Sequence, residues 1–147
     1  MDSIAAVELK DITKHFAKVF AADHVSMCVH QGEVLALLGE NGAGKSTVMK
    51  ILYGLYQSDS GQIFIDGKER KIKTPKDAMD AGISMIQQHF SLVPAHTVAE
   101  NIILGNCRGR IDYKATEKEI QDLADQYDFR IPVGEKVKNL TVGEQQK

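Results

Sequence analysis

The sequence is poor in the features that mark membrane-spanning, exported or nucleic-acid-binding proteins. No apolar run in its 147 residues approaches the ~20 that a spanning helix needs. The N-terminus lacks the charged and then apolar layout of a secretion signal. A formal net charge of -2 gives no general affinity for nucleic acid or anionic lipid. Because there is also no internal repeat, low-complexity tract or linker, we expect one cytoplasmic domain, or part of a larger one.

Cysteine is equally scarce, with only Cys28 and Cys107 in the chain. The two have no metal-binding spacing, so we expect free thiols in a reducing cytosol, although spacing alone leaves a pairing open. Basic residues gather only at 68–73. This cluster predicts the solvated edge of a hairpin, which also guards against edge-to-edge pairing, rather than a nucleic-acid site.

Glycine, in contrast, is concentrated in one informative stretch. Residues 39–47 read GENGAGKST and fit the phosphate-binding pattern G-x-x-x-x-G-K-[ST]. The glycines let backbone N–H groups turn toward one anion, the lysine reaches the β- and γ-phosphates, and the hydroxyl binds Mg²⁺. The apolar run 33–38 predicts a buried parallel strand, and residues 46–53 predict a helix. Since this order aims a helix N-terminus at a phosphate, we predict nucleotide binding.

The rest of the first half predicts mainly strands. Residues 7–12 and 25–29 alternate apolar and polar side chains, as half-exposed strands do. Residues 61–65 and 68–72 flank an Asp-Gly pair at 66–67, which is a strong signal for a β-hairpin.

Helices and one further strand follow. Thr74 and Pro75 predict the cap and first turn of a short helix, and residues 82–86 predict a second buried strand. Residues 97–104 predict a short helix, and residues 112–127 an amphipathic one. The apolar stripe of this last helix comprises Ile120, Leu123, Ala124 and Tyr127.

Three further features bear on function. Phe16 ends the first strand, where an aromatic ring could stack on a nucleobase or simply pack in the β layer. The glutamines at 87–88 follow a predicted strand, where a carbonyl oxygen could contact Mg²⁺ or orient a water. Thr141 and Gly143 belong to a segment that suits a helix N-terminus. That end could hold a phosphate, or it could be an ordinary cap with Glu144 as the partner of Thr141.

Taken together, the order and spacing of these motifs resemble the nucleotide-binding domain of ATP-binding cassette (ABC) transporters. The resemblance covers essentially the whole chain. It implies an α/β fold, a P-loop NTPase cassette with an N-terminal antiparallel β layer, a partial parallel core sheet and a helical subdomain. The β layer and core part would occupy about residues 1–95, the helical subdomain about 96–140, and the signature motif 140–147.

The resemblance also implies roles for individual residues. Phe16 would stack on adenine, Lys45 would bind the β- and γ-phosphates, and Ser46 would bind Mg²⁺. Gln88 would contact Mg²⁺ or the attacking water, and would sense the membrane subunit through a docking loop at 89–94. Lys45 and Gln88 are therefore the catalytic candidates.

Two sets of residues would surround the ATP. Within one cassette, the phosphates would meet Gly39, Asn41, Gly42, Ala43, Gly44, Lys45, Ser46 and Thr47. Thr141 and Gly143 would bind the γ-phosphate of an ATP held by a second cassette, in a head-to-tail sandwich. The signature departs from the commonest form, Leu-Ser-Gly-Gly-Gln, at Thr141, Val142 and Glu144. The last two changes and the stretch 88–94 are similar to importers of simple sugars and nucleosides, whose ATPase subunit carries two cassettes in one chain.

That branch of the family implies a function and partners. The protein would be the ATP-binding subunit of an importer that couples ATP hydrolysis to uptake of a simple sugar or nucleoside, at the inner face of the cell membrane. Its partners would be a second cassette, transmembrane permease subunits and, indirectly, an extracytoplasmic substrate-binding protein, with no nucleic acid. Two alternatives stand beside it. One is a cytosolic ABC ATPase of translation or DNA repair, which the near-neutral, insert-free chain disfavours, and the other is an inactive nucleotide-binding remnant.

The family pattern continues past residue 147. The strand that ends in Asp-Glu (Walker B) and the switch histidine follow the signature in the family, whereas all five histidines here precede it. The resemblance therefore implies an N-terminal fragment that ends at the signature. Without a water-orienting carboxylate, this chain alone is expected to bind ATP weakly at best and not to hydrolyse it. A missing central strand would leave apolar surface exposed.

Overall fold

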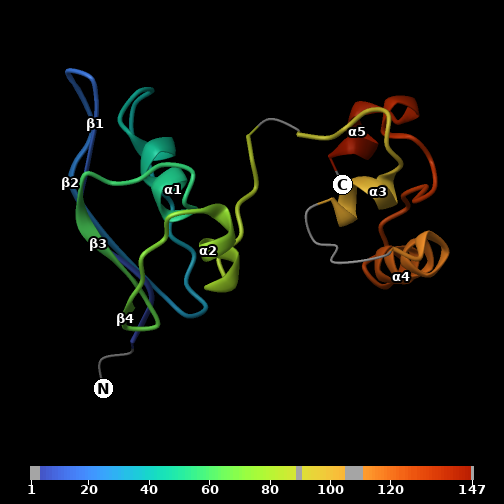
Figure 1. Cartoon of the computed structure of the whole chain (residues 1–147), viewed down its shortest axis with the longest axis horizontal. Helices are drawn as coiled ribbons and strands as arrows, with labels where there is room; N and C mark the ends of the chain where they lie inside the picture. The colour runs from blue at the N-terminus through green and yellow to red at the C-terminus, as the bar shows by residue number, and fades with distance from the viewer. Residues whose placement is uncertain (1–3, 89–90, 105–110, 147) are drawn as a thin grey trace. The chain divides into compact units, whose positions relative to one another are not determined.

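The computed structural model of the chain describes residues 4–88, 91–104 and 111–146. The chain divides into two compact units, residues 1–86 and residues 87–147, each with its own hydrophobic core (Figure 1). None of the described helices is long and apolar enough to cross a lipid bilayer.

The first unit is built on a four-stranded antiparallel sheet with the strand order β2-β1-β3-β4. Its strands are β1 (Ala5–Phe16), β2 (Val19–His30), β3 (Ser60–Ile65) and β4 (Lys68–Glu69). The strands predicted at 7–12 and 25–29 are confirmed. The hairpin is confirmed too, because Asp66 and Gly67 adopt the positive φ angles, 50° and 72°, that its tight turn requires. Its second arm is only two residues long, shorter than the predicted 68–72.

A bulge in β1 lets two apolar residues three positions apart both face the core. The register of β1 against β2 shifts between Leu9 and Ile12, and both side chains are buried. Asp11, between them, has a φ of 49°, and its N–H donates a hydrogen bond to the Ser26 hydroxyl (2.9 Å). An extra residue turns the following side chain to the other face of the strand. The bulge therefore restores the burial that strict alternation would lose.

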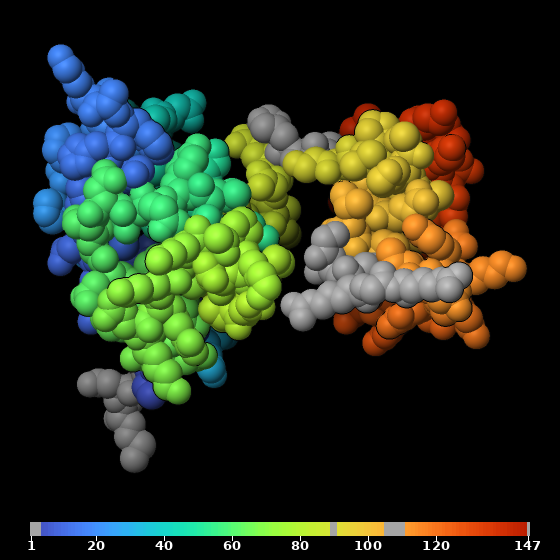
Figure 2. Space-filling model, viewed as in Figure 1, coloured from blue at the N-terminus to red at the C-terminus, as the bar shows by residue number. Residues whose placement is uncertain are grey.

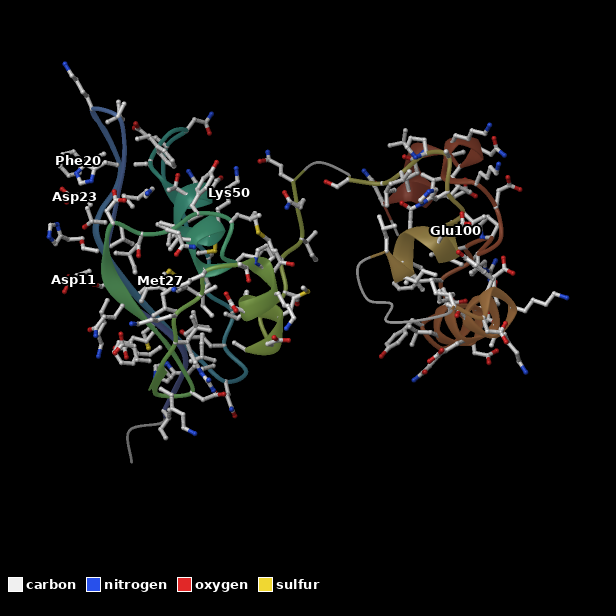
Figure 3. The ribbon with its side chains drawn as sticks, viewed as in Figure 1. Asp11, Phe20, Asp23, Met27, Lys50 and Glu100 are labelled. Atoms are coloured by element: carbon white, nitrogen blue, oxygen red, sulfur yellow. The ribbon has the colours of Figure 1, made fainter. Side chains whose placement is uncertain are left out.

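Two helices cover one face of this sheet (Figure 1). They are α1 (Lys45–Leu52) and α2 (Pro75–Asp80). Their contribution to the core comes from Val48, Ile51 and Ala78. Figure 3 shows Met27 on the face that the helices cover, whereas Phe20 and Asp23 point away from it. The sheet is thus apolar toward the helices and exposed on its other face, as a one-sided antiparallel sheet should be.

The basic cluster lies on the exposed rim of the first unit. Its charged side chains are exposed, and only Ile72 turns inward to the core. Figure 2 shows the hairpin and α2, in green and yellow-green, on the surface of this unit. The prediction of a solvated hairpin edge at 68–73 is confirmed.

Two predicted strands are not formed. Residues 33–38 and 82–86 form no strand, and every strand pairing in the described part of the chain is antiparallel. Val34 is 96% exposed and Ile86 is 98% exposed, so the prediction of buried parallel strands here is wrong. A strand is stable only when neighbouring strands form hydrogen bonds with its N–H and C=O groups. Among the described residues, neither segment has a neighbouring strand. The expectation of exposed apolar surface is confirmed.

The second unit is helical, and its predicted helices are confirmed. They are α3 (Val98–Ile103), α4 (Tyr113–Gln126) and α5 (Val142–Gln145), and the structure adds a short 3-10 helix, Val137–Asn139, that the sequence did not predict. Ile120 and Ala124 of the predicted α4 stripe are buried. Leu123 and Tyr127 of the same stripe are instead exposed, and with Phe129 they line an apolar cavity of about 340 Å³. The stripe therefore only partly reaches the core.

Candidate nucleotide-binding site

The predicted phosphate loop, residues 39–47, leads directly into α1. Its exposed tip is a turn, in which the Ala43 N–H donates a hydrogen bond to the carbonyl oxygen of Glu40 (3.2 Å). Gly42 and Gly44 have left-handed φ angles of 87° and 84°, and Gly44 is the N-cap of the helix. These angles need glycine and make the chain turn sharply before the helix begins.

Gly44 also packs against the sheet. A Cβ atom at this position would lie 1.9 Å from the carbonyl oxygen of Ala21 in β2. No side chain fits at that distance, so glycine is required for space as well as for conformation. This close approach fixes the start of α1 against β2.

The N-terminus of α1 has no side-chain cap. Among the α helices in the described residues it is alone in this, because side chains cap all the others. The capping residues of those helices are Thr74, Thr97, Asp112 and Thr141. The first N–H groups of a helix have no partner within the helix, and the dipole makes this end positive. The start of α1 is therefore suited to an anion.

Lys45 places a positive charge across the loop. Its Nζ donates hydrogen bonds to the carbonyl oxygens of Gly39 and Glu40, each at 2.7 Å. Ser46 and Thr47 follow in the first turn of α1 and add two hydroxyls. An ammonium, a glycine cradle and an open helix end are the groups that bind a polyphosphate. Lys45, Ser46 and Thr47 thus lie together with the glycines at the start of α1, although the strand predicted ahead of the loop is not formed.

The same loop offers little to a metal ion. In the part of the chain that the structure describes, no group of three or more His, Cys, Asp or Glu side chains could hold one. An Mg²⁺ ion at Ser46 would need phosphate oxygens and waters as its other ligands, which is its usual preference. Gln88, the other predicted ligand, lies in the second unit, exposed and in a coil rather than at a strand end.

Three other residues named in the sequence predictions lie outside the described residues. They are His89 and Phe90 of the predicted docking loop and Cys107. Cys28 is a free, exposed thiol.

Phe16, the predicted base-stacking residue, is neither buried in the β layer nor isolated. It is 43% exposed at the end of β1. Its ring makes an edge-to-face contact with Tyr56, with 5.2 Å between the ring centroids. The Lys14 ammonium lies 5.6 Å from the centroid of the Phe16 ring. The sequence did not indicate these neighbours, because they depend on the pairing of β1 with β3, which no local pattern reveals.

An exposed carboxylate ties this region together. Asp59 accepts hydrogen bonds from the Lys14 ammonium (2.7 Å) and from the His15 N–H (2.6 Å). Its own N–H donates to the carbonyl oxygen of Thr13 (2.8 Å). The hydrogen bond from Lys14, followed by those from His15, lowers the pKa of Asp59 to about 2. Asp59 is therefore an anion at any physiological pH.

The signature segment forms the capping box that the sequence predicted. The Thr141 hydroxyl accepts a hydrogen bond from the Glu144 N–H (3.3 Å), and Glu144 Oε2 accepts from the N–H and the hydroxyl of Thr141, both at 2.8 Å. Gly143 lies inside α5, and a Cβ there would meet no atom within 4 Å. The Gln145 amide donates to the carbonyl oxygen of Leu140 (3.1 Å) and so ties α5 to the preceding turn.

Comparison with known proteins identifies this combination of motifs. A family model described as ABC transporter matches residues 22–147. The chain belongs to the ABC transporter family. The resemblance drawn from the loop and the signature is thereby confirmed.

Curated relatives in this family are import proteins. The chain is 42% identical to a glucose import ATP-binding protein of Haloferax volcanii, over 96% of this chain and 31% of the relative. It is 46% identical to a guanosine import ATP-binding protein of Bacillus subtilis, over 96% and 28%. It is 44% identical to a ribose import ATP-binding protein of Escherichia coli, over 100% and 30%. The chain thus spans about a third or less of the length of these relatives.

Solved structures establish the fold. A nucleotide-free ATP-binding cassette from an ABC transporter matches with a TM-score of 0.80 at 24% identity, over 97% of this chain and 61% of the other. An ABC transporter cassette in its ADP conformation matches with a TM-score of 0.79 at 24% identity, over 98% and 62%. The expected α/β cassette fold of the ABC family is confirmed.

Proposed function

We propose that this chain is the ATP-binding part of an importer subunit, in which ATP hydrolysis drives uptake of a simple sugar or a nucleoside. The observation that carries the proposal is the phosphate loop, where the Lys45 ammonium spans a glycine turn ahead of an uncapped helix. The names of the three relatives, for glucose, guanosine and ribose import, support the class of transported molecule.

In this proposal, each end of the nucleotide meets a different part of the first unit. Lys45 and the N–H groups of the first turn of α1 bind the β- and γ-phosphates, and Ser46 binds Mg²⁺. Phe16 stacks on the adenine, a contact that gives affinity without reading the edges of the base. Bound Mg-ATP supplies the phosphoryl group whose transfer to water releases the energy for transport.

The second unit would complete the site on assembly. Gln88 contacts the metal ion or orients the attacking water, and Thr141 and Gly143 bind the γ-phosphate of an ATP on a second cassette. Transmembrane permease subunits carry the substrate, and an extracytoplasmic binding protein delivers it to them. The protein would then work at the inner face of the cell membrane, attached through the permease.

The test uses the intact protein together with its permease in lipid vesicles. Replacing Lys45 with Ala removes a charged hydrogen-bond donor, so Mg-ATP affinity should fall tenfold or more and ATP-driven uptake should stop. Titration with Mg-ATP and uptake of labelled glucose, ribose and guanosine measure the two effects. Lys71→Ala, on the exposed hairpin rim, is the matched control and should change neither. Unchanged nucleotide affinity in Lys45→Ala would refute the proposed site.

A further inference from the structure

A short segment after α1 returns to that helix before it reaches the sheet. The N–H groups of Leu55 and Tyr56 both donate to the carbonyl oxygen of Lys50, at 2.8 Å and 3.2 Å. The Lys50 ammonium also lies 5.4 Å from the centroid of the Tyr56 ring. Figure 3 shows Lys50 on α1, the helix that begins at Lys45. Tyr56 is therefore attached to the helix that carries the phosphate-binding groups.

The same tyrosine holds the base-stacking aromatic. The rings of Tyr56 and Phe16 meet at an interplanar angle of 72°, the edge-to-face geometry that aromatic pairs favour. Tyr56 is half-buried, whereas Phe16 keeps 43% of its surface exposed. The Lys14 ammonium is within cation–π distance of Phe16. Phe16 is thus held by Tyr56 and Lys14 while part of its ring stays accessible.

The far end of the segment is anchored to β1. Asp59 binds the Lys14 ammonium and the His15 N–H through its carboxylate, and the Thr13 carbonyl oxygen through its own N–H. Lys14 is only 17% exposed in this arrangement, so this ion pair is partly shielded from solvent. Residues 55–59 are therefore joined to α1 at one end and to the last residues of β1 at the other.

We propose that residues 55–59 are a brace that sets the position of Phe16 relative to the phosphate loop, with Tyr56 as a positioning residue for base stacking and Asp59 as its anchor. The proposal rests on the proposed role of Phe16 as the surface on which adenine stacks. ATP is bound at its base and at its triphosphate. Both contacts add to affinity only when the protein presents them at the right spacing, and a preformed spacing lowers the cost of binding. The brace is the segment that joins the two.

The experiment compares ATP with a ligand that has no base. Mg-ATP and Mg-tripolyphosphate are titrated into the intact protein by calorimetry. Tyr56→Leu removes the ring but keeps an apolar side chain, so ATP affinity should fall roughly three- to tenfold. Tripolyphosphate affinity should stay within about twofold, because the phosphate loop is untouched. Tyr56→Phe keeps the ring and should therefore bind ATP as tightly as the wild type. Asp59→Ala should weaken ATP binding but not tripolyphosphate binding, as Tyr56→Leu does.

Two further variants separate the possible failures. Phe64→Leu is the matched control, because Phe64 is a half-buried aromatic in β3 with the Lys10 ammonium 4.6 Å from its ring centroid, and it should leave both affinities unchanged. Phe16→Leu tests the base-stacking role itself, and if ATP affinity does not change, the role and the brace are both wrong. If Phe16→Leu weakens ATP binding but Tyr56→Leu does not, the brace alone is wrong. Equal loss of ATP and tripolyphosphate binding in Tyr56→Leu would also overturn the brace, since it would show a general structural effect.

Discussion

The two helix N-termini that are predicted to meet phosphate are built in opposite ways. The N-cap of α1 is Gly44, whose lack of a side chain leaves the first N–H groups without a side-chain partner, and Lys45 adds a positive charge beside them. The N-cap of α5 is Thr141, whose hydroxyl and N–H both form hydrogen bonds with Glu144. The first end is open to an anion as it stands. At the N-terminus of α5, the Glu144 carboxylate already accepts the hydrogen bonds that an anion could receive from Thr141.

The charges reinforce this difference. A carboxylate in the first turn stabilises a helix by about 0.3–1 kcal/mol through the helix dipole. Glu144 provides that stabilisation for α5, but it would repel a phosphate approaching Thr141. For α5 to bind a γ-phosphate, the phosphate must therefore replace Glu144 at the cap. No carboxylate has to be displaced at α1. The N-terminus of α1 therefore suits a phosphate site that is always available, and that of α5 suits one that forms only when Glu144 is displaced.

The largest effect is expected where α1 is held against the sheet. Gly44→Ala combines a left-handed φ with a Cβ 1.9 Å from the Ala21 carbonyl oxygen, so the free energy of unfolding should fall by about 3 kcal/mol. Urea unfolding of the intact protein, followed by circular dichroism, measures the loss. Gly42→Ala is the control, because its φ is similar at 87° but nothing lies within 4 Å of its Cβ, and it should cost about 1 kcal/mol. Equal losses would mean that the contact with β2 is not what fixes the start of α1.

Removing the negative charge of Glu144 should make the N-terminus of α5 more like that of α1. Glutamine at position 144 can still reach back to the N–H of Thr141, so Glu144→Gln keeps the capping box and removes its charge. ATP-driven association with a second cassette should strengthen by about 1 kcal/mol, or roughly fivefold, measured by sedimentation at low salt. Glu100→Gln changes the same box position in α3, where Thr97 is the cap, and should leave association unchanged. A similar gain in both variants would indicate a general charge effect rather than a phosphate site at α5.

How far the sequence predicted this site depends on how local each feature is. The glycine turn ahead of α1, the cap at Thr74 and the box of Thr141 involve groups only a few residues apart, so the pattern of residue types was enough to predict these local features. Residues 33–38 and 82–86 also matched a local pattern, that of a buried strand. They fail as strands because a strand depends on distant partners, which a run of apolar residues does not specify.

The contacts around Phe16 were missed for the same reason. Tyr56 and Asp59 come close to β1 only because Thr13 pairs with Ser60 across the sheet. The bulge at Asp11 sets that register, and its signal, a single residue with positive φ, is not readable from composition or alternation. Pairing between distant strands thus decided what surrounds Phe16, whereas local chemistry decided what surrounds Lys45.

A smaller effect separates the structural and functional roles of the signature glycine. Gly143 does not need a positive φ, and a Cβ there has open space. Gly143→Ala should therefore raise stability by about 0.5 kcal/mol, since alanine favours a helix more than glycine does. ATP-driven association should nevertheless weaken, because a methyl group would obstruct the approach of a phosphate to the N–H groups of α5. Stability is followed by urea unfolding and association by sedimentation. If ATP-driven association instead strengthens along with stability, α5 does not bind the γ-phosphate.

The smallest expected effect concerns sensitivity to acid. A helix whose capping box contains a carboxylate should lose stability in acid, whereas α1 has no such box. In α2, hydrogen bonds from the Thr74 hydroxyl and from the N–H groups of Lys73 and Thr74 lower the pKa of Asp77 below its ordinary value of 3.8. A lowered pKa in the folded state means that the box stabilises the protein above about pH 4, and that this contribution disappears as the pH falls further. The difference in Tm between the wild type and Asp77→Asn should therefore be present at pH 6 and shrink below pH 4. Thr74→Val removes the donor with the largest effect and should reduce the same pH dependence. A constant difference from pH 6 to pH 3 would show that the box does not hold the proton off Asp77. In that case, the contrast with the glycine-capped α1 would rest on geometry alone.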